Sequence, residues 1–288
     1  RRGQVDAVRG ITFEVSKGEI LGIVGESGSG KSVTSYALMR ILDAGGTIKA
    51  GEATYSGIDL RRSTERDMRD IRGREISMIF QNPRAALNPI RKVGHQIEDV
   101  LRHHARGTRY DAYAKAIAAL EAVKINDAEA RYNAYPFELS GGMCQRIVCA
   151  IALACDPRLL IADEPTTGLD ITTQKAVMDL VRDLIRERGM SSILITHDLG
   201  LAAQYCDRIL VMKDGMIVEQ GDPVQIFSNP QHPYSRKLVD ATPRAGESVR
   251  SLLPPEDRGT ELVPDVSDTP LLEVRNLVKT YAGKSGPV

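Results

Sequence analysis

Short apolar runs alternate with amphipathic stretches along much of the chain. Residues 20–24, 159–162 and 191–196 form apolar runs of strand length. From about residue 139 to about residue 221, strand and helix patterns alternate, which is typical of a parallel sheet. Helical patterns dominate residues 82–139 and predict a helical subdomain, whereas residues 1–80 are β-rich. The regular alternation ends after residue 221.

Two shorter segments carry their own signals. The segment KDGM, residues 213–216, lies between two apolar runs and predicts a hairpin with a type I′ Asp-Gly turn. The segment GEATYSGIDL, residues 51–60, has the pattern of a strand. Both predictions concern local structure and assign no function.

The composition is that of a globular protein without a charge bias. The 288 residues are 42% hydrophobic, which is enough for a sizeable core. Lys plus Arg and Asp plus Glu both number 38, so we expect no nucleic-acid partner and only local anion binding. The longest apolar run, residues 147–155, is shorter than the ~20 residues of a membrane-spanning helix. No CxxC pair is present, so buried free thiols are favoured over a metal site or disulfide for Cys144, Cys149, Cys155 and Cys206.

A glycine-rich segment follows the first apolar run. Residues 25–32, GESGSGKS, match GxxxxGK[ST] between a predicted strand and a predicted helix. Glycines let backbone N–H groups approach phosphate oxygens, and the start of the helix adds unpaired N–H groups. A flexible loop that fits the pattern by chance is the alternative. The ATP-binding residues predicted here are Gly25, Glu26, Ser27, Gly28, Ser29, Gly30, Lys31 and Ser32, with Lys31 on the β- and γ-phosphates and Ser32 on Mg²⁺.

Two acidic residues end another predicted strand. Asp163 and Glu164 follow residues 159–162, and Pro165 stops the strand. Ligands gather at the carboxyl ends of parallel strands, so both acids are expected to face the glycine-rich loop. Neighbouring side chains on an extended segment point in different directions. We therefore predict that Asp163 binds Mg²⁺ and that Glu164 orients or deprotonates a water molecule, the alternative being a solvated turn.

A third motif identifies the family. The segment LSGGMCQR, residues 139–146, places Ser140, Gly141 and Gly142 before an apolar helix, which is a second anion site of the helix N-terminus type. Here the chain resembles the ATP-binding cassette (ABC) ATPases, whose signature is LSGGQ or a close variant. Their other motifs follow in order: Gln81 in MIFQNP, TTGLD at residues 166–170, and His197 in LITHD.

The resemblance covers residues 5 to about 234 and implies a fold. This fold is α/β, an ABC-type P-loop NTPase with a mostly parallel core sheet, an antiparallel β subdomain and a helical subdomain. It also implies two modules arranged head to tail, with each ATP enclosed between the phosphate loop of one module and the signature of the other. The cofactors are then ATP and Mg²⁺.

The resemblance further implies a role for each motif. Glu164 becomes the catalytic base and His197 the γ-phosphate sensor, while Gln81 joins Ser32 and Asp163 around Mg²⁺ and the attacking water. The residues that would bind the ATP of the opposing module are Ser140, Gly141, Gly142 and Asp170. Cys144 stands where relatives often carry a basic or longer side chain, so we expect the local interface contacts to differ there.

Two more segments resemble ATPases of the dipeptide, oligopeptide and nickel importers. They are residues 78–97, after Gln81, and residues 229–243, which contain HPY. The implied function is ATP hydrolysis that powers an ABC importer for peptides or a related small solute. The implied partners are a second ABC module, membrane-embedded permease subunits and, indirectly, an extracytoplasmic solute-binding protein, with the chain peripheral on the cytoplasmic face of the membrane. No cysteine follows Cys206, so we predict no iron-sulfur cluster of the kind that many relatives hold after HPY.

Two other functions are disfavoured by the sequence. A soluble ABC protein that acts on ribosomes or DNA would be favoured by a long charged helical linker, but residues 242–270 are Pro-rich and irregular, as in a flexible tether. A regulatory module without turnover is disfavoured by the intact Glu164.

The end of the chain predicts a tandem arrangement. We expect an ABC module at 1–228, an extension at 229–245, a linker at 246–270 and the start of a second module at 271–288, where Tyr281 occupies the place of the adenine-stacking aromatic. Similar pentapeptides place Gly3 and Gly286 at a spacing of 286 − 3 = 283 residues, about one period of a fused protein. In isolation the module would form a homodimer. Because the first module's own opening strand would precede Arg1, we expect weak adenine stacking, or residues 271–281 paired in that strand's place.

Overall fold

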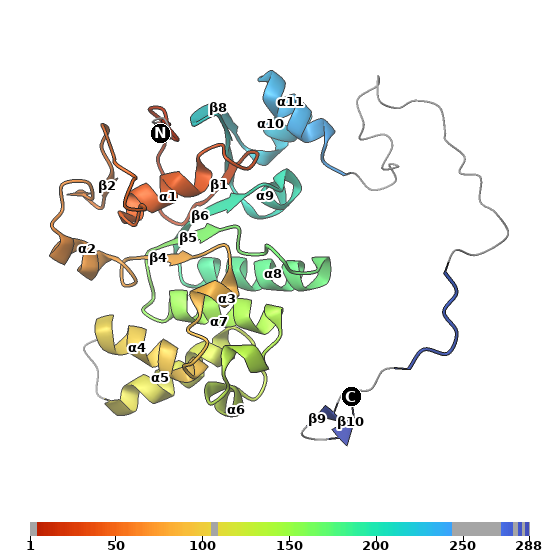
Figure 1. Cartoon of the computed structure of the whole chain (residues 1–288). Helices are drawn as coiled ribbons and strands as arrows, with labels where there is room; N and C mark the ends of the chain where they lie inside the picture. Colours follow the sequence, from red (N-terminus) through yellow and green to blue (C-terminus); the bar gives the residue numbers. More distant parts are fainter. Residues whose placement is uncertain (1–4, 105–108, 244–271, 279–281, 284–285, 288) are drawn as a thin grey trace. The chain divides into compact units, whose positions relative to one another are not determined.

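The structure is a computed structural model, shown in Figure 1, that describes residues 5–104, 109–243, 272–278, 282–283 and 286–287. The chain forms two compact units, Arg1–Arg244 and Ala245–Val288. In the second unit, β9 (Ala282–Gly283) and β10 (Gly286–Pro287) pair antiparallel. Residues 272–278 form no strand, so the structure does not show the predicted pairing of residues 271–281, whereas the role of Tyr281 lies outside the described residues and stays a prediction.

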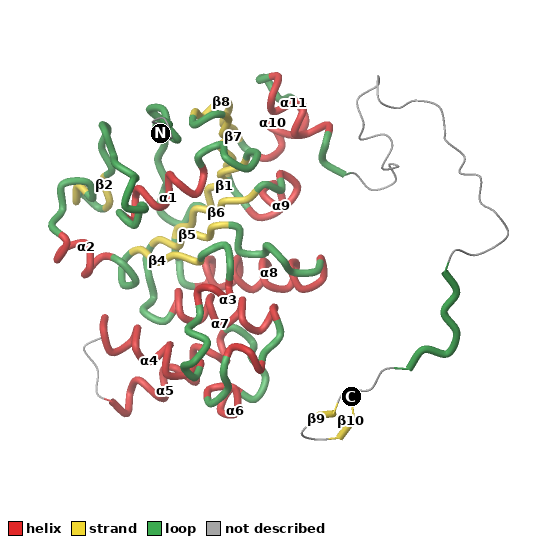
Figure 2. The backbone as a smooth tube through the Cα atoms, viewed as in Figure 1, coloured by secondary structure: helices red, strands yellow, loops and turns green. Residues whose placement is uncertain are grey.

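A six-stranded sheet crosses the first unit, and Figure 2 shows its strands in yellow. All neighbouring strands pair in parallel except β7 and β8, which are antiparallel. The predicted parallel sheet is therefore confirmed. The spatial order of the strands is β4 (Ile76–Ile79), β5 (Leu159–Asp163), β6 (Ser191–Thr196), β1 (Ile20–Val24), β7 (Arg208–Lys213) and β8 (Met216–Gly221).

Alternate residues of each central strand belong to two hydrophobic clusters on opposite faces of the sheet. In β1, Ile20 and Val24 belong to the cluster that contains the apolar residues of α7 and α8, whereas Leu21 and Ile23 belong to the cluster that contains Met39 of α1. Figure 1 shows α1 on one side of the sheet and α7 and α8 on the other. Both faces are covered, so the strands read as continuous apolar runs.

The helices around the sheet begin where the sequence supplies caps. Ser140, Asp170 and Asp198 each accept a hydrogen bond from the backbone N–H three residues on, which satisfies one of the free donors at a helix start. The helices of this α/β core are α1 (Lys31–Met39), α7 (Gly141–Leu153), α8 (Ile171–Glu187), α9 (Leu199–Tyr205), α10 (Pro223–Ser228) and α11 (Pro233–Asp240). Within the described residues, none of the helices is long and apolar enough to cross a membrane.

Both hairpin segments form two-residue turns. Asp214 and Gly215 join β7 to β8 with φ of 49° and 79°, as the predicted type I′ turn requires. The segment expected to form one strand at residues 51–60 instead folds back on itself, because Ser56 and Gly57 also have positive φ and join β2 (Thr54–Tyr55) to β3 (Ile58–Asp59).

The regular elements described between residues 83 and 138 are all helices. They are α3 (Pro83–Ala86), α4 (Val93–His104), α5 (Arg109–Ala122), α6 (Ala128–Tyr132) and the 3₁₀ turn η1 (Pro136–Glu138). The Tyr132 ring lies against Gly94, and its hydroxyl donates to the buried Glu98 at 2.6 Å. Burial, then this bond, raises the pKa of Tyr132. The absence of a side chain at Gly94 is what lets α4 and α6 pack closely.

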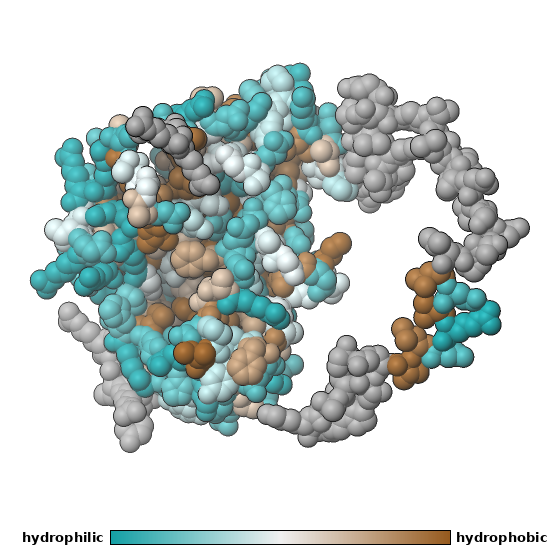
Figure 3. Space-filling view, viewed as in Figure 1, coloured by the Kyte–Doolittle hydropathy of each residue, from teal (hydrophilic) through white to brown (hydrophobic). Residues whose placement is uncertain are grey.

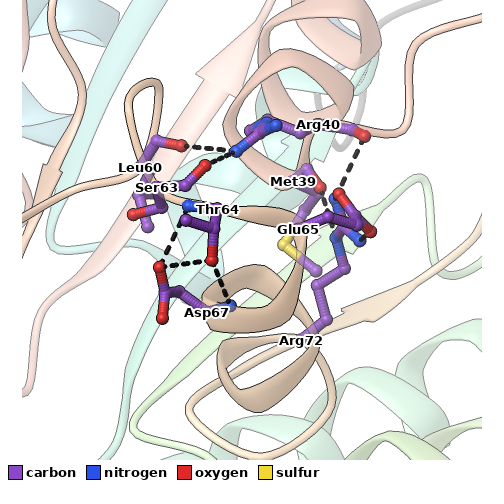
Figure 4. A network of polar contacts seen from close by, with 8 residues as sticks. All are labelled: Met39, Arg40, Leu60, Ser63, Thr64, Glu65, Asp67 and Arg72. Carbon is purple, nitrogen blue, oxygen red and sulfur yellow. Dashed lines mark hydrogen bonds and ion pairs between the residues drawn. The ribbon is translucent and has the colours of Figure 1, made fainter.

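A polar network joins α1 to α2 (Glu65–Ile71), as Figure 4 shows. The Arg72 guanidinium donates to Met39 O at 2.7 Å and to Arg40 O at 3.2 Å, at the carboxyl end of α1. It also pairs with Glu65 at 2.6 Å. A cation at this end of a helix satisfies carbonyls without an intrahelical partner and complements the helix dipole.

The same network includes the capping residues at the start of α2. Thr64 caps α2 and forms a reciprocal capping box with Asp67. Arg40 reaches across from α1 and donates to Leu60 O at 3.4 Å and to Ser63 O. The antiparallel β2–β3 segment and α2 are thus tied to the helix that follows the glycine-rich loop.

Three of the four cysteines are buried, and all four are free thiols in the structure. Cys155 is half-buried. Burial raises the pKa of Cys149 and of Cys206 to about 12, so these thiols are unreactive side chains of the core.

Candidate functional site

The glycine-rich loop lies between β1 and α1. Gly28 and Gly30 have φ of 82° and 101°, which favours glycine at both positions. A Cβ on Gly30 would lie 2.5 Å from Ala7 O, so a side chain is also excluded by close packing. Ser29 Oγ is buried and has no hydrogen-bond partner among the described residues.

Lys31 is folded back over this loop. Its side chain is only 5% exposed, and its ammonium donates to Gly25 O at 2.7 Å and to Glu26 O at 2.9 Å. Burial lowers the pKa of Lys31, and the carboxylates of Glu164 and Asp163 only partly oppose this effect. The ammonium is thus held at the mouth of the loop by neutral carbonyls, where an anion would be a stronger partner.

Asp163 is buried at the end of β5. One carboxylate oxygen accepts from Ser32 Oγ at 2.8 Å, and the other has no hydrogen-bond partner among the described residues. Burial raises the pKa of Asp163, although the hydroxyls of Ser32 and Tyr36 both oppose this effect. A hydroxyl and a carboxylate with a free oxygen fit Mg²⁺, which prefers a few oxygen ligands from the protein and keeps other positions for water and phosphate.

Glu164 follows in a strained backbone conformation, with φ of 46°. Its Oε2 accepts from Gln81 Nε2 and from Thr167 Oγ1, both at 2.9 Å, and its Oε1 lies 3.3 Å from His197 Nδ1. Burial alone would raise the pKa of Glu164, but the bonds from Thr167, His197 and Gln81 outweigh it and hold the pKa below its usual value. The carboxylate is therefore ionised and oriented.

These side chains come from the carboxyl ends of four adjacent strands. Lys31 follows β1, Gln81 follows β4, Asp163 ends β5 and His197 follows β6. The parallel order β4-β5-β6-β1 brings them to one edge of the sheet, as the rule for ligand sites in parallel sheets predicts. For Asp163, the expectation from the sequence that the acid faces the loop agrees with the Ser32–Asp163 bond.

The signature residues lie elsewhere on the first unit. Ser140 is the N-cap of α7 and is exposed, while Gly141 and Gly142 lie against the start of α8. A Cβ on Gly142 would lie 2.6 Å from Thr173 Cγ2. Asp170 is exposed and caps α8 by accepting from Thr173 N at 3.0 Å. Among the described residues, no hydrogen bond or ion pair joins this group to the phosphate loop.

Cys144 is directed into the core of the helical segment. The side chain is fully buried, and its Sγ lies 3.5 Å from Pro136 O. The expected difference in the interface contacts of the signature stays a prediction.

Sequence reasoning missed two contacts to this site. Thr167 bonds Glu164, and Tyr234 accepts a hydrogen bond from Glu26 N at 2.9 Å. Thr167 lies within the segment TTGLD, but nothing in the pattern distinguishes it from Thr166. The contact between Tyr234 and Glu26 spans 208 positions and depends on the tertiary fold.

Two family models match the chain. Residues 8–167 match the family described as ABC transporter, and residues 218–263 match the oligopeptide/dipeptide transporter C-terminal region. Among solved structures, two dimeric ABC cassettes, one of them in a post-hydrolysis state bound to ADP and Pi, have TM-scores of 0.69 and 0.68 at 27% identity. They cover 77% and 76% of this chain, which spans 94% and 91% of theirs, so the expected fold class is confirmed.

Curated relatives are similar over nearly the whole chain. The oligopeptide transport ATP-binding protein OppD of Bacillus subtilis is 46% identical over 98% of this chain and 78% of its own length. The glutathione import ATP-binding protein GsiA of Pectobacterium atrosepticum is 45% identical over 99% of the chain, which spans only 49% of that relative. The motif-based resemblance is thereby confirmed: this chain belongs to the ABC transporter family.

Proposed function

We propose that this chain is the ATP-binding and ATP-hydrolysing subunit of an ABC importer for peptides or a related small solute. The observation that carries the proposal is the group of Lys31, Ser32, Asp163 and the oriented Glu164 at one edge of the parallel sheet. These are the side chains that phosphoryl transfer to water requires, arranged on adjacent strands.

The phosphate loop would hold the ATP phosphates. Backbone N–H groups of residues 28–32 surround the start of α1, and its dipole favours negative charge there. Phosphate oxygens would draw the Lys31 ammonium from the Gly25 and Glu26 carbonyls, because an ion pair in a buried site is stronger than a bond to a neutral oxygen. Ser29 Oγ offers one more donor at the base of the loop.

Ser32 and Asp163 would hold Mg²⁺, joined by Gln81 as the family resemblance implies. The ion supplies charge neutralisation on the phosphates when it is bound. The free, buried oxygen of Asp163 supports this assignment, because an unpaired carboxylate oxygen is costly unless a cation meets it.

Glu164 would act as the general base on the attacking water. Its lowered pKa keeps it ionised at neutral pH, and the bonds from Gln81 and Thr167 fix its second oxygen. His197 is 64% exposed and lies 3.3 Å from Oε1, so its ring is accessible for contact with the γ-phosphate. The roles of base and sensor are thus divided between two side chains in contact.

A second module would complete the site. Ser140, Gly141, Gly142 and Asp170 have no bond to the phosphate loop of their own module within the described residues, so they would bind the nucleotide of a partner. The dimeric cassettes that this chain resembles support this arrangement. We propose that the partner is a second ABC module, fused in tandem or supplied by another copy, in line with relatives of about twice this chain's length.

The membrane partners are inferred from the helical segment and the C-terminal region. Ile90 and Phe137, in the segment after Gln81, are 85% and 73% exposed, and such apolar side chains suit a protein interface. Figure 3 shows exposed hydrophobic residues as separate patches on a largely hydrophilic surface. We propose that permease subunits bind here, that a solute-binding protein delivers the solute, and that the chain is peripheral on the cytoplasmic face.

Peptides are the favoured solute class because residues 218–263 match the oligopeptide/dipeptide transporter region. Binding of two ATP molecules would close the paired modules, since each nucleotide makes contacts that only the closed state offers. Hydrolysis would reopen them.

The test compares wild type with Glu164→Gln in the assembled dimer, with Glu187→Gln on the exposed end of α8 as a matched control. We expect Glu164→Gln to bind ATP with wild-type affinity and to lose steady-state hydrolysis by about 100-fold or more, whereas Glu187→Gln hydrolyses normally. Unchanged hydrolysis in Glu164→Gln would refute the assignment of the base. Uptake of labelled di- and oligopeptides by vesicles that hold the whole transporter tests the solute class.

A further inference from the structure

The C-terminal region contacts the phosphate loop through one tyrosine. Tyr234, near the start of α11, is 5% exposed, and its hydroxyl accepts from Glu26 N at 2.9 Å. Glu26 itself lies on the exposed part of the loop. This bond links the phosphate loop to the region that the oligopeptide/dipeptide family model matches.

The bond falls on the peptide unit that also holds Lys31. In a planar trans peptide, the C=O of one residue and the N–H of the next point in opposite directions. Gly25 O accepts from the Lys31 ammonium at 2.7 Å, and Glu26 N of the same unit donates to Tyr234. Lys31 and Tyr234 are therefore bonded to the C=O and the N–H of one planar peptide group. Each bond strengthens the other by polarising that group.

Neighbouring groups hold Tyr234 in place. His232 caps α11, and its Nδ1 accepts from Tyr234 N at 3.1 Å, while Pro233 occupies the first helical position. Lys213 Nζ lies 5.1 Å from the centre of the tyrosine ring, a cation–π contact. Each residue of the segment His-Pro-Tyr thus has a structural role, since the first caps the helix, the second starts it and the third reaches the loop.

The segment is anchored on β8. The Glu219 carboxylate accepts from Gln231 N at 2.7 Å and from His232 N at 2.9 Å. The hairpin that carries β8 also touches the loop directly, because Gly215 N donates to Ser29 O at 3.0 Å. The β7–β8 hairpin therefore both anchors the segment that carries Tyr234 and contacts the phosphate loop itself.

We propose that Tyr234 is a positioning residue for nucleotide binding, whose hydroxyl fixes the Gly25–Glu26 peptide and so keeps the phosphate loop in one conformation. The proposal rests on the proposed function, in which this loop binds ATP. A loop already held in its binding conformation loses less conformational entropy when the nucleotide binds. Once phosphates occupy the loop they order it themselves, so the hydroxyl matters more for affinity than for the chemical step.

The test uses Tyr234→Phe, which removes the hydroxyl and keeps the ring. Tyr205→Phe is the matched control, because Tyr205 is 4% exposed and its hydroxyl also makes one 2.9 Å bond, to Asp179, away from the loop. Two quantities are measured: the dissociation constant for ATP by calorimetry, and hydrogen exchange of the peptide that spans residues 20–32. In a hydrolysing dimer, KM and kcat are measured as well.

We expect Tyr234→Phe to weaken ATP binding and raise KM about threefold to tenfold, with kcat within twofold of wild type, and to speed exchange in residues 20–32. Tyr205→Phe should match wild type in all of these. If Tyr234→Phe binds ATP as wild type does, or if it loses protection across the whole chain rather than in the loop, the proposal is wrong. Failure of the wild-type protein to bind ATP would instead refute the proposed function, and the exchange measurement would still test the loop contact.

Discussion

At the scale of single residues, the site is defined by how Glu164 is held. A glutamate at φ 46° is strained by its Cβ, and the conformation persists because three side chains bond its carboxylate and Ile195 O accepts from its backbone N–H at 2.9 Å. Asp163, one residue earlier, is buried within β5 and turned toward Ser32. The change of backbone conformation between adjacent residues gives each acid a different environment.

Thr167→Val should move the acid limb of the ATPase profile to higher pH. The hydroxyl of Thr167 is the foremost group that lowers the pKa of Glu164, so its removal raises that pKa. The base form exists above the folded pKa, and activity is therefore lost earlier as the pH falls. The measurement is kcat against pH, with Thr242→Val, whose hydroxyl bonds Leu238 O instead, as the control. An acid limb that stays in place would show that Thr167 does not tune the base.

Gly142→Ala should destabilise the module, whereas Gly141→Ala should be tolerated by the fold. A Cβ at Gly142 would lie 2.6 Å from Thr173 Cγ2, and a β-branched threonine on a helix has little freedom to move. At Gly141 the nearest atom is 3.8 Å away. We expect Gly142→Ala to cost about 1–2 kcal/mol more than Gly141→Ala in denaturant unfolding. Equal costs would contradict the close approach of α7 and α8.

The sequence predicts those site residues whose role depends on their near neighbours in the chain. The spacing from Gly25 to Ser32 predicts a phosphate loop, and acids directly after a buried strand are predicted to lie at the edge of the sheet where ligands bind. The contacts of Thr167 and Tyr234 were not predictable, because their hydroxyls act across turns and between distant elements. The direction of the Cys144 side chain likewise depends on how η1 packs against α7.

At the scale of elements, the α1 helix connects the phosphate loop to α2 and the antiparallel segment. Its first residue is Lys31, and its last carbonyls are bonded by Arg72 from the end of α2. The sequence predicted one strand at residues 51–60, but positive φ at Ser56 and Gly57 makes a hairpin. The conformation of these two turn residues decides between a strand and a hairpin.

Arg72→Ala should destabilise the first unit by about 1–2 kcal/mol. The side chain is 21% exposed and donates to two carbonyls at the end of α1. Arg62→Ala is the matched control, because the Arg62 side chain is 82% exposed and, among the described residues, pairs only with Asp59, at 3.4 Å, so its loss should cost at most about 0.5 kcal/mol. Thermal and denaturant unfolding of the two variants measures the difference, and equal stabilities would contradict a capping role for Arg72.

Gly94→Ala should loosen the helical segment. A Cβ at this position would lie 1.9 Å from the Tyr132 ring, and that ring is fixed by its bond to Glu98. We expect a loss of about 1–3 kcal/mol and faster hydrogen exchange in α4 and α6. Gly45→Ala, at a position with no atom within 4 Å of the added Cβ, serves as the control. Unchanged exchange in α4 would show that the helices can separate without cost.

At the scale of the whole molecule, the proposed phosphate site and the signature residues lie on one module, and among the described residues no hydrogen bond or ion pair joins them. The phosphate loop side is internally bonded through Ser32, Asp163 and Glu164, while the signature side presents Ser140 and Asp170 to solvent. Ile171, directly after Asp170, is 86% exposed at the first position of α8. An apolar side chain this exposed, beside the signature glycines, fits a surface that a partner module covers.

Ile171→Glu should therefore weaken ATP-dependent association of modules without weakening the fold. A carboxylate at the first position of α8 interacts favourably with the positive end of the helix dipole. The isolated module should therefore unfold at the wild-type temperature or slightly above it. Burial of that charge in an interface is costly, and we expect association to weaken about tenfold or more. The measurement is sedimentation equilibrium with ATP in a Glu164→Gln background, where the closed dimer persists. Val224→Glu on α10, at a residue 74% exposed, controls for added surface charge and should associate normally. If both substitutions leave association unchanged, Ile171 lies outside the interface and the head-to-tail arrangement loses this support.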